Sequence, residues 1–296
     1  MKDEEKKQIT IKEAVTQLEG ARSSTIISYI AVPGAMIEPS DELVLVDNLD
    51  SLKPEKGKIK KLDLFLNSYG GFMETAYKLV RICWDYTEEF NVIVPLVAKS
   101  AATVICLGAK EIVMTNVAEL GPIDPIIQHP YKPNLRVPAR AVKDFFEFFD
   151  TSDTGKNLNE EVKKRLVEQF DPYLIGVYEG SLKSAKQYSE KLLSEYMLKD
   201  EKDKIQDVVE KLTEHYASHG HVIDRKEAKE ELGLNVIYPD SDEKLLIAIK
   251  QLFGIYNQFM QDNKIVKLQG TRDINRNIQI MPSPQQEIQP PQNNWE

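Results

Sequence analysis

The residues that could perform chemistry lie in two short segments of the chain. Gly70 and Gly71 follow an apolar run, and a glycine pair after a strand can turn its backbone N–H groups toward a ligand because glycine has no Cβ. Ser100 follows residues 92–97, another apolar run, and precedes the small residues of a helix start. A serine at a strand-to-helix turn can act as a nucleophile, with the N–H groups of Gly71 and Ala101 as oxyanion donors and Gly70 allowing the turn.

Alternating apolar strands and amphipathic helices must hold these segments. We expect strands at residues 25–32, 62–66, 92–97 and 111–114, with helices at 42–52, 72–86 and 101–109 between them. Short links in this alternation imply parallel pairing, and the carboxyl ends of such strands are where sites form. Pro95 is unusual inside a central strand and predicts an irregularity near the site.

The successive motifs resemble those of a known family. They are Asn-Ser-Tyr-Gly-Gly at 67–71, Ala-Lys-Ser-Ala-Ala-Thr at 98–103, Glu-Ile-Val-Met at 111–114 and Glu-Leu-Gly-Pro-Ile-Asp-Pro at 119–125. This arrangement resembles the serine dehydrogenase proteinase family, a branch of the Clp protease and crotonase superfamily related to signal peptide peptidase A. The likeness covers about residues 8–240.

The resemblance implies an α/β fold with a Clp/crotonase-like repeated β-β-α core, a mostly parallel sheet and a C-terminal helical extension. We expect the catalytic core at 1–150, the helical extension with a closing strand motif that returns to the core at 151–265, and a disordered tail rich in Gln, Asn and Pro at 266–296. The implied activity is that of a serine-type peptidase, which hydrolyses peptide bonds through an acyl-enzyme on Ser100 without a cofactor. The resemblance also implies a homo-oligomer that acts on peptide or protein substrates.

The general base is the open question. The histidine base of the Clp proteolytic subunit would fall near Pro122, so it is absent here, whereas that subunit's triad aspartate would fall near His219. His219 is therefore one candidate, because histidine titrates near neutral pH. Signal peptide peptidase A relatives use a lysine some tens of residues after the serine, which points to Lys143, provided that burial lowers its pKa.

Two further polar residues adjoin the predicted site. Lys99 is next to the nucleophile and is expected to point to the other side of the turn. Asp124 either caps local backbone N–H groups or orients the base. His215, His219 and His221 lack the intervening helical glutamate of zinc hydrolases, and the sequence predicts no metal site.

Composition narrows the class of protein. The formal charge of −9, with basic residues interspersed among acids, argues against a nucleic-acid partner. The N-terminus lacks the apolar run of a signal peptide, no apolar stretch approaches about 18 residues, and the two cysteines, Cys83 and Cys106, lack metal or redox spacing. We expect a cytoplasmic protein without a membrane partner.

Two other functions are compatible with the same motifs. Crotonase-like acyl-CoA chemistry uses a similar backbone oxyanion hole and would tolerate Ser100→Ala. A non-catalytic protein-interaction scaffold is the other alternative, since the Clp-type histidine is missing.

Overall fold

A large sheet of mixed direction forms the centre of the molecule. The computed structural model of the 296-residue chain describes residues 9–128, 136–169, 171–216 and 218–280. Its seven-stranded sheet has the order β10-β5-β3-β2-β1-β11-β12. The strands are β1 (Thr25–Ala31), β2 (Ile59–Asn67), β3 (Thr87–Val94), β5 (Ile112–Met114), β10 (Val236–Ile237), β11 (Ile265–Gly270) and β12 (Asn275–Ile280). The first five strands in that order pair in parallel, and β11 and β12 pair antiparallel, so the predicted α/β class with a mostly parallel sheet is confirmed.

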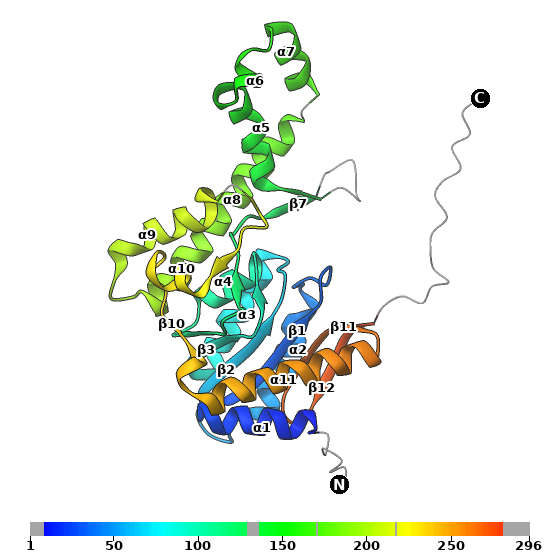
Figure 1. Ribbon diagram of the computed structural model, residues 1–296, viewed down its shortest axis with the longest axis vertical. Helices are drawn as coiled ribbons and strands as arrows, with labels where there is room; N and C mark the ends of the chain where they lie inside the picture. Colours follow the sequence, from blue (N-terminus) through cyan, green and yellow to red (C-terminus); the bar gives the residue numbers. More distant parts are fainter. Residues whose placement is uncertain (1–8, 129–135, 170, 217, 281–296) are drawn as a thin grey trace, which may run out of the picture.

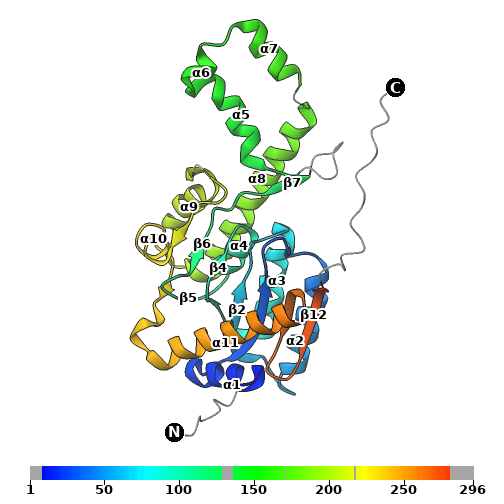
Figure 2. The same ribbon diagram turned by 45° about the vertical axis from the view of Figure 1, so that its right-hand side comes forward.

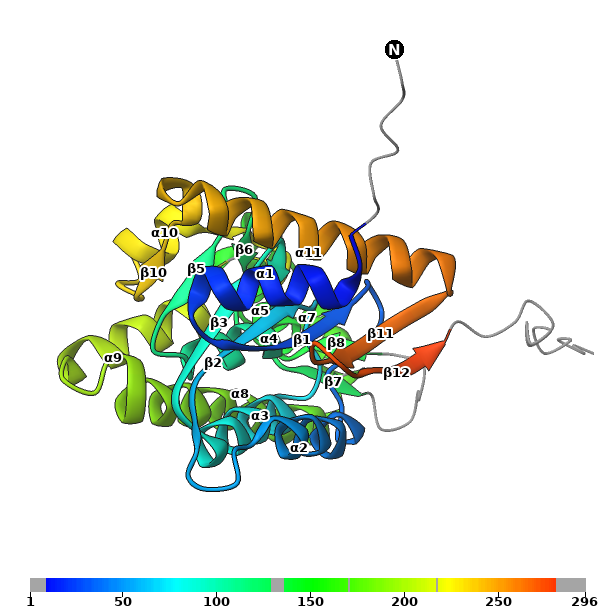
Figure 3. The same cartoon turned by 90° about the horizontal axis from the view of Figure 1, so that it is seen from below.

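Helices cover both faces of this sheet. Helices α1 (Ile11–Arg22) and α11 (Glu243–Asp262) lie side by side on one face, and α2 (Ser40–Leu52) and α3 (Met73–Tyr86) lie on the other (Figures 1 and 3). Alternate residues of β1 point to opposite faces: Ile26 packs in the cluster under α1 and α11, whereas Ile27 packs in the cluster under α2 and α3. The apolar strands are therefore buried on both sides, as their composition predicts.

The third strand breaks at Pro95, which confirms the predicted irregularity. β3 ends at Val94, and the chain then forms β4 (Val97–Ala98), which leaves the large sheet. β4 pairs in parallel with β6 (Glu119–Leu120), and β6 pairs antiparallel with β9 (Ile223–Asp224). This small three-stranded sheet carries Ser100 at its edge and brings the segment before β9 toward it.

A helical arm extends from the core (Figures 1 and 2). It consists of the β7 (Ile126–Gln128) and β8 (Arg136–Pro138) pair, α5 (Ala139–Thr151), α6 (Asp153–Lys156), α7 (Glu160–Glu168) and the first turns of α8 (Pro172–Leu192). Val142 of α5 packs with Leu174 and Tyr178 of α8 in a separate apolar cluster. The helical extension expected from residue 151 thus has its first helix already at Ala139.

The second half of α8 returns to the core, where Ala185 and Leu192 are buried. Two short π-helical segments at Leu193–Met197 and Lys211–His215, with α9 (Lys202–Glu210) and α10 (Arg225–Glu230), complete this side. Among the helices described, none combines the length and the apolar character needed to cross a membrane.

The predicted disordered tail at 266–296 is wrong for its first part. β11 and β12 occupy residues 265–270 and 275–280 and extend the sheet next to β1, while residues 281–296 lie outside those described. The strand pattern is hidden in the sequence because two polar side chains of β11, Lys267 and Gln269, occupy fully buried positions. Both are buried with hydrogen-bond partners, which makes polar residues compatible with the core.

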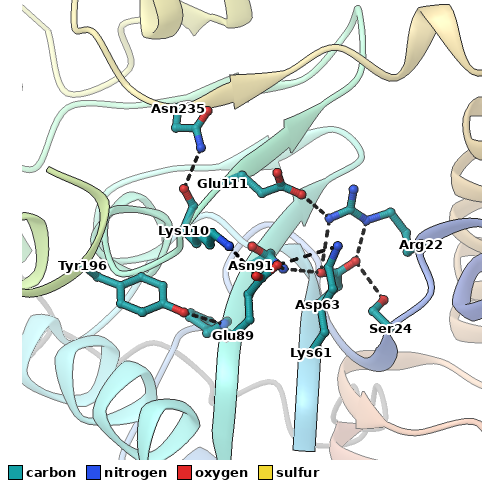
Figure 4. A network of polar contacts seen from close by, with 11 residues as sticks. Arg22, Ser24, Lys61, Asp63, Glu89, Asn91, Lys110, Glu111, Tyr196 and Asn235 are labelled. Atoms are coloured by element: carbon teal, nitrogen blue, oxygen red, sulfur yellow. Dashed lines mark hydrogen bonds and ion pairs between the residues drawn. The ribbon is translucent and has the colours of Figure 1, made fainter.

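A buried ionic network holds α1 against the amino ends of the strands (Figure 4). Arg22 donates from Nε to Asp63 Oδ2 at 2.6 Å and also pairs with Glu111, and Asn91 donates to Asp63 Oδ1 at 2.9 Å. Burial opposes the charged form of Arg22, but the hydrogen bonds and charges of Asp63 and Glu111 raise the pKa of its guanidinium. The network lies at the end of the strands opposite to Gly70 and Ser100.

Candidate active site

Ser100 occupies a strained turn between β4 and α4 (Ala101–Leu107). Its backbone has φ 53° and ψ −119°, a conformation that few residues other than glycine adopt and that is concentrated at functional sites. The residue is 3% exposed, and its hydroxyl makes no hydrogen bond within the described part of the chain. Every residue of α4 is buried, so the packing of this helix fixes the position of the turn that precedes it.

The glycine turn is pressed against Ser100. Gly70 has φ 106°, and a Cβ there would lie 2.8 Å from the Lys99 oxygen and 2.9 Å from Ser100 Cβ. On the other side, a Cβ at Gly71 would lie 2.2 Å from the Ile37 oxygen. Real carbon atoms do not approach this closely, so both positions require glycine and the two loops are in direct contact.

Ile37 determines the orientation of the glycine turn. Its N–H donates to Gly70 O and its C=O accepts from the Phe72 N–H, each at 2.9 Å, in a parallel bridge centred on Gly71. In such a bridge the N–H of the central residue points away from its partner. The Gly71 N–H therefore points away from Ile37, and it has no hydrogen-bond acceptor among the described residues.

A second free donor lies close by. The Ala101 N–H is at the first position of α4, where no intrahelical acceptor exists, and no other acceptor is found in the described chain. The nitrogen is near the glycine turn, because a Cβ at Gly70 would lie 3.2 Å from it. The Gly70 N–H, by contrast, donates to Ser68 Oγ at 3.1 Å. Gly71 and Ala101 can thus offer their N–H groups to an oxyanion, and Gly70 supplies the turn.

His219 and Asp124 face each other. His219 Nδ1 lies 3.4 Å from Asp124 Oδ2, within ion-pair distance but not aligned for a hydrogen bond. The other oxygen of Asp124 accepts a hydrogen bond from the Arg140 N–H at 3.1 Å, at the start of α5. Asp124 therefore accepts a hydrogen bond from the first turn of α5, a distant segment, and also lies beside the imidazole. Among the described residues, no hydrogen bond joins the His219 ring to the Ser100 hydroxyl.

The two lysine candidates have other partners. Lys143 Nζ lies 3.4 Å from Glu147 Oε1 and 3.7 Å from Glu214 Oε2, beside a cavity of about 500 Å³ between α5 and α8. The described contacts do not bring Lys143 to Ser100. Lys99 extends toward the segment that carries His219, because its Nζ lies 2.8 Å from Glu119 Oε1 and donates at 3.2 Å to Gly220 O, in the residue after His219.

Thr103 ends the motif at residues 98–103, and its supporting role becomes visible in the structure. Its buried hydroxyl lies 2.8 Å from both Ala98 O and Gly121 O and accepts from the Gly121 N–H at 3.2 Å. It therefore ties the Ser100 turn to the segment that leads to Asp124. A signal for this role is a lone hydroxyl in the otherwise apolar helix at 101–107.

The chain is similar to proteins of one known family. The model of a family described as ClpP-like SDH-type serine proteinase matches residues 5–279. An uncharacterized protein of Methanocaldococcus jannaschii is 26% identical over 228 residues, which cover 74% of this chain and 71% of that protein.

Two solved structures show a more distant similarity. A mutant of the 1510-N membrane-bound stomatin-specific protease is 13% identical with a TM-score of 0.43, covering 72% of this chain and 79% of that one. A peptidase from Plasmodium falciparum is 12% identical with a TM-score of 0.34, covering 66% of this chain and 87% of that one.

Proposed function

The chain belongs to the ClpP-like SDH-type serine proteinase family, as its motifs predict, and from this premise we propose that it hydrolyses peptide bonds with Ser100 as the nucleophile. One observation supports the proposal most: a strained serine lies against the glycine turn, and the N–H groups of Gly71 and Ala101 have no acceptor among the described residues. Donors held in place before the reaction stabilise the negative charge that develops on the substrate oxygen.

The proposed mechanism proceeds through an acyl-enzyme. Ser100 Oγ forms a bond to the scissile carbonyl carbon, its proton passes to the base, and the carbonyl oxygen receives hydrogen bonds from Gly71 and Ala101. The carbon–nitrogen bond then breaks, and the protonated base gives its proton to the leaving amine. Water repeats the attack on the ester and restores the serine.

We assign the base to His219. The Asp124 carboxylate, 3.4 Å from Nδ1, supports this assignment, because a carboxylate beside one ring nitrogen is the arrangement that orients the histidine base of a catalytic triad. Lys143 is the alternative, and it would have to act without the two glutamates that now pair with it. The substitutions His219→Gln and Lys143→Met separate the two candidates.

The substrate proposed is a peptide or protein segment with apolar side chains. Tyr69 and Phe72 flank the glycine pair and are 40% and 49% exposed, and Val222 near His219 is 50% exposed. Large apolar side chains that stay exposed around a site are typical of binding surfaces. Assembly into a homo-oligomer and a cytoplasmic location remain predictions from the sequence.

A fluorophosphonate probe tests the proposal. The serine oxygen displaces fluoride from phosphorus, and the expected result is an adduct mapped to Ser100 that is absent from Ser100→Ala. Ser51→Ala provides a control, because this exposed serine near the end of α2 donates to Asn48 O, outside the proposed site, and its loss should leave the adduct unchanged. A folded protein that gives no adduct would favour acyl-CoA chemistry or an interaction scaffold instead.

A further inference from the structure

A buried lysine on the C-terminal strand β11 lies in an ionic cluster. The Lys267 side chain is 0% exposed, and its Nζ donates to Met36 O at 2.8 Å and to Glu38 Oε1 at 2.7 Å. The same atom lies 3.0 Å from Asp41 Oδ1, an ion pair that is not well directed as a hydrogen bond. Removing a charge from water is unfavourable, so an ammonium in this place needs all these partners.

The same cluster fixes the start of α2. Asp41 Oδ2 accepts hydrogen bonds from the Tyr29 hydroxyl at 2.7 Å and from the Glu38 N–H at 2.9 Å. Burial and the nearby carboxylates of Asp41 and Glu38 raise the pKa of Tyr29 well above its ordinary value, so the phenol keeps its proton and donates it. The segment from Met36 to Asp41 is therefore held at its backbone and at its side chains.

The residue between the two held positions is Ile37. Lys267 binds Met36 and Glu38, which are the neighbours of Ile37 on either side. Ile37 in turn holds the glycine turn through hydrogen bonds with Gly70 and Phe72. The orientation of the Gly71 N–H depends on Ile37, because Gly71 is the central residue of the bridge that these two residues form. A continuous set of contacts thus runs from Lys267 to the proposed oxyanion donor.

We propose that Lys267 is a positioning residue that sets the direction of the Gly71 N–H by holding the segment around Ile37. This inference rests on the proposed peptidase function. Such a residue acts on the transition state more than on substrate binding, because the oxyanion exists only after the serine has attacked.

The Arg22 network offers a control of the same kind. Arg22 is also a nearly buried cation paired with carboxylates (Figure 4). It lies toward the amino ends of the strands, whereas the glycine turn follows the carboxyl end of β2. A general loss of stability should follow from either substitution. A loss of turnover in a protein that remains folded should follow only from the change at Lys267.

The experiment compares Lys267→Met with Arg22→Met in the full chain. For Lys267→Met we expect kcat on a peptide substrate to fall about 100-fold, as when one oxyanion donor is lost, with little change in KM. Inhibition by a peptide aldehyde should weaken by a similar factor, because its adduct places an oxygen where the oxyanion forms. Arg22→Met should lower the melting temperature and leave the kcat of the folded protein unchanged.

A folded Lys267→Met protein with wild-type kcat would overturn the inference. If Lys267→Met fails to fold, Glu38→Ala decides the matter, because that side chain is 31% exposed and its removal leaves Met36 O and Asp41 in place. For Glu38→Ala we expect kcat to fall about tenfold, which is less than the effect of losing an oxyanion donor. An unchanged kcat would again refute the proposal. A wild-type protein that fails to label with the fluorophosphonate would instead show that the peptidase function itself is wrong.

Discussion

Gly71→Ala tests the oxyanion hole most sharply. The added methyl carbon would start 2.2 Å from the Ile37 oxygen and 2.3 Å from the Ile37 nitrogen. Carbon and oxygen atoms that are not bonded stay about 3.3 Å apart, so the turn must shift by about 1 Å. A misplacement of that size lowers turnover by about 100-fold, which corresponds to about 2.7 kcal/mol in the activation free energy.

The assay is steady-state hydrolysis of a peptide substrate, with the rate of fluorophosphonate labelling and thermal unfolding measured on the same samples. Gly57→Ala is the matched control, since Gly57 also has a positive φ of 88° but no atom within 4 Å of the place that a Cβ would occupy. Gly57→Ala should lower the free energy of unfolding by about 1 kcal/mol, because alanine disfavours a positive φ, and it should leave kcat unchanged. A Gly71→Ala protein with wild-type kcat would refute the assignment of the Gly71 N–H as a donor.

Three further outcomes are expected. His219→Gln should lower kcat by about 1,000-fold, the scale of general base catalysis, while Lys143→Met should leave it unchanged; the reverse result would assign the base to Lys143. Arg22→Met should reduce the unfolding free energy, measured by chemical denaturation, by about 3–5 kcal/mol, because it leaves the Asp63 carboxylate buried without its cation. A loss below about 1 kcal/mol would contradict the stabilising role of the Arg22–Asp63 pair. The hydrogen bond from Lys186 lowers the pKa of Glu214 below its ordinary value of 4.5, so its stabilisation is present above that pH and disappears as the pH falls through the lower folded value. Glu214→Gln should therefore be less stable than the wild type at neutral pH and equally stable in strong acid, as measured by urea unfolding at each pH.

Local sequence is sufficient for the parts of the site that lie in short loops. Gly70, Gly71 and Ser100 each follow an apolar strand, and parallel strands bring such loops to one edge of the sheet. Pro95 is also informative, because a residue without an N–H cannot continue the ladder and the chain leaves the large sheet just after it.

Contacts between distant segments cannot be predicted in the same way. Asp124 meets His219 near the pairing of β6 with β9, and neither of these two-residue strands has an apolar pattern long enough to recognise. β11 escapes recognition because buried positions held by Lys267 and Gln269 resemble a polar tail until their partners around Asp41 are known. Buried polar residues whose partners are distant in the sequence thus prevent the recognition of the strand that contains them.

The most direct test is a crystal structure of the fluorophosphonate adduct. We predict phosphorus bonded to Ser100 Oγ and a phosphoryl oxygen about 2.7–3.1 Å from both the Gly71 and the Ala101 nitrogen. Phosphorus on another residue, or a phosphoryl oxygen directed away from both nitrogens, would contradict the assignment of the nucleophile and its oxyanion hole.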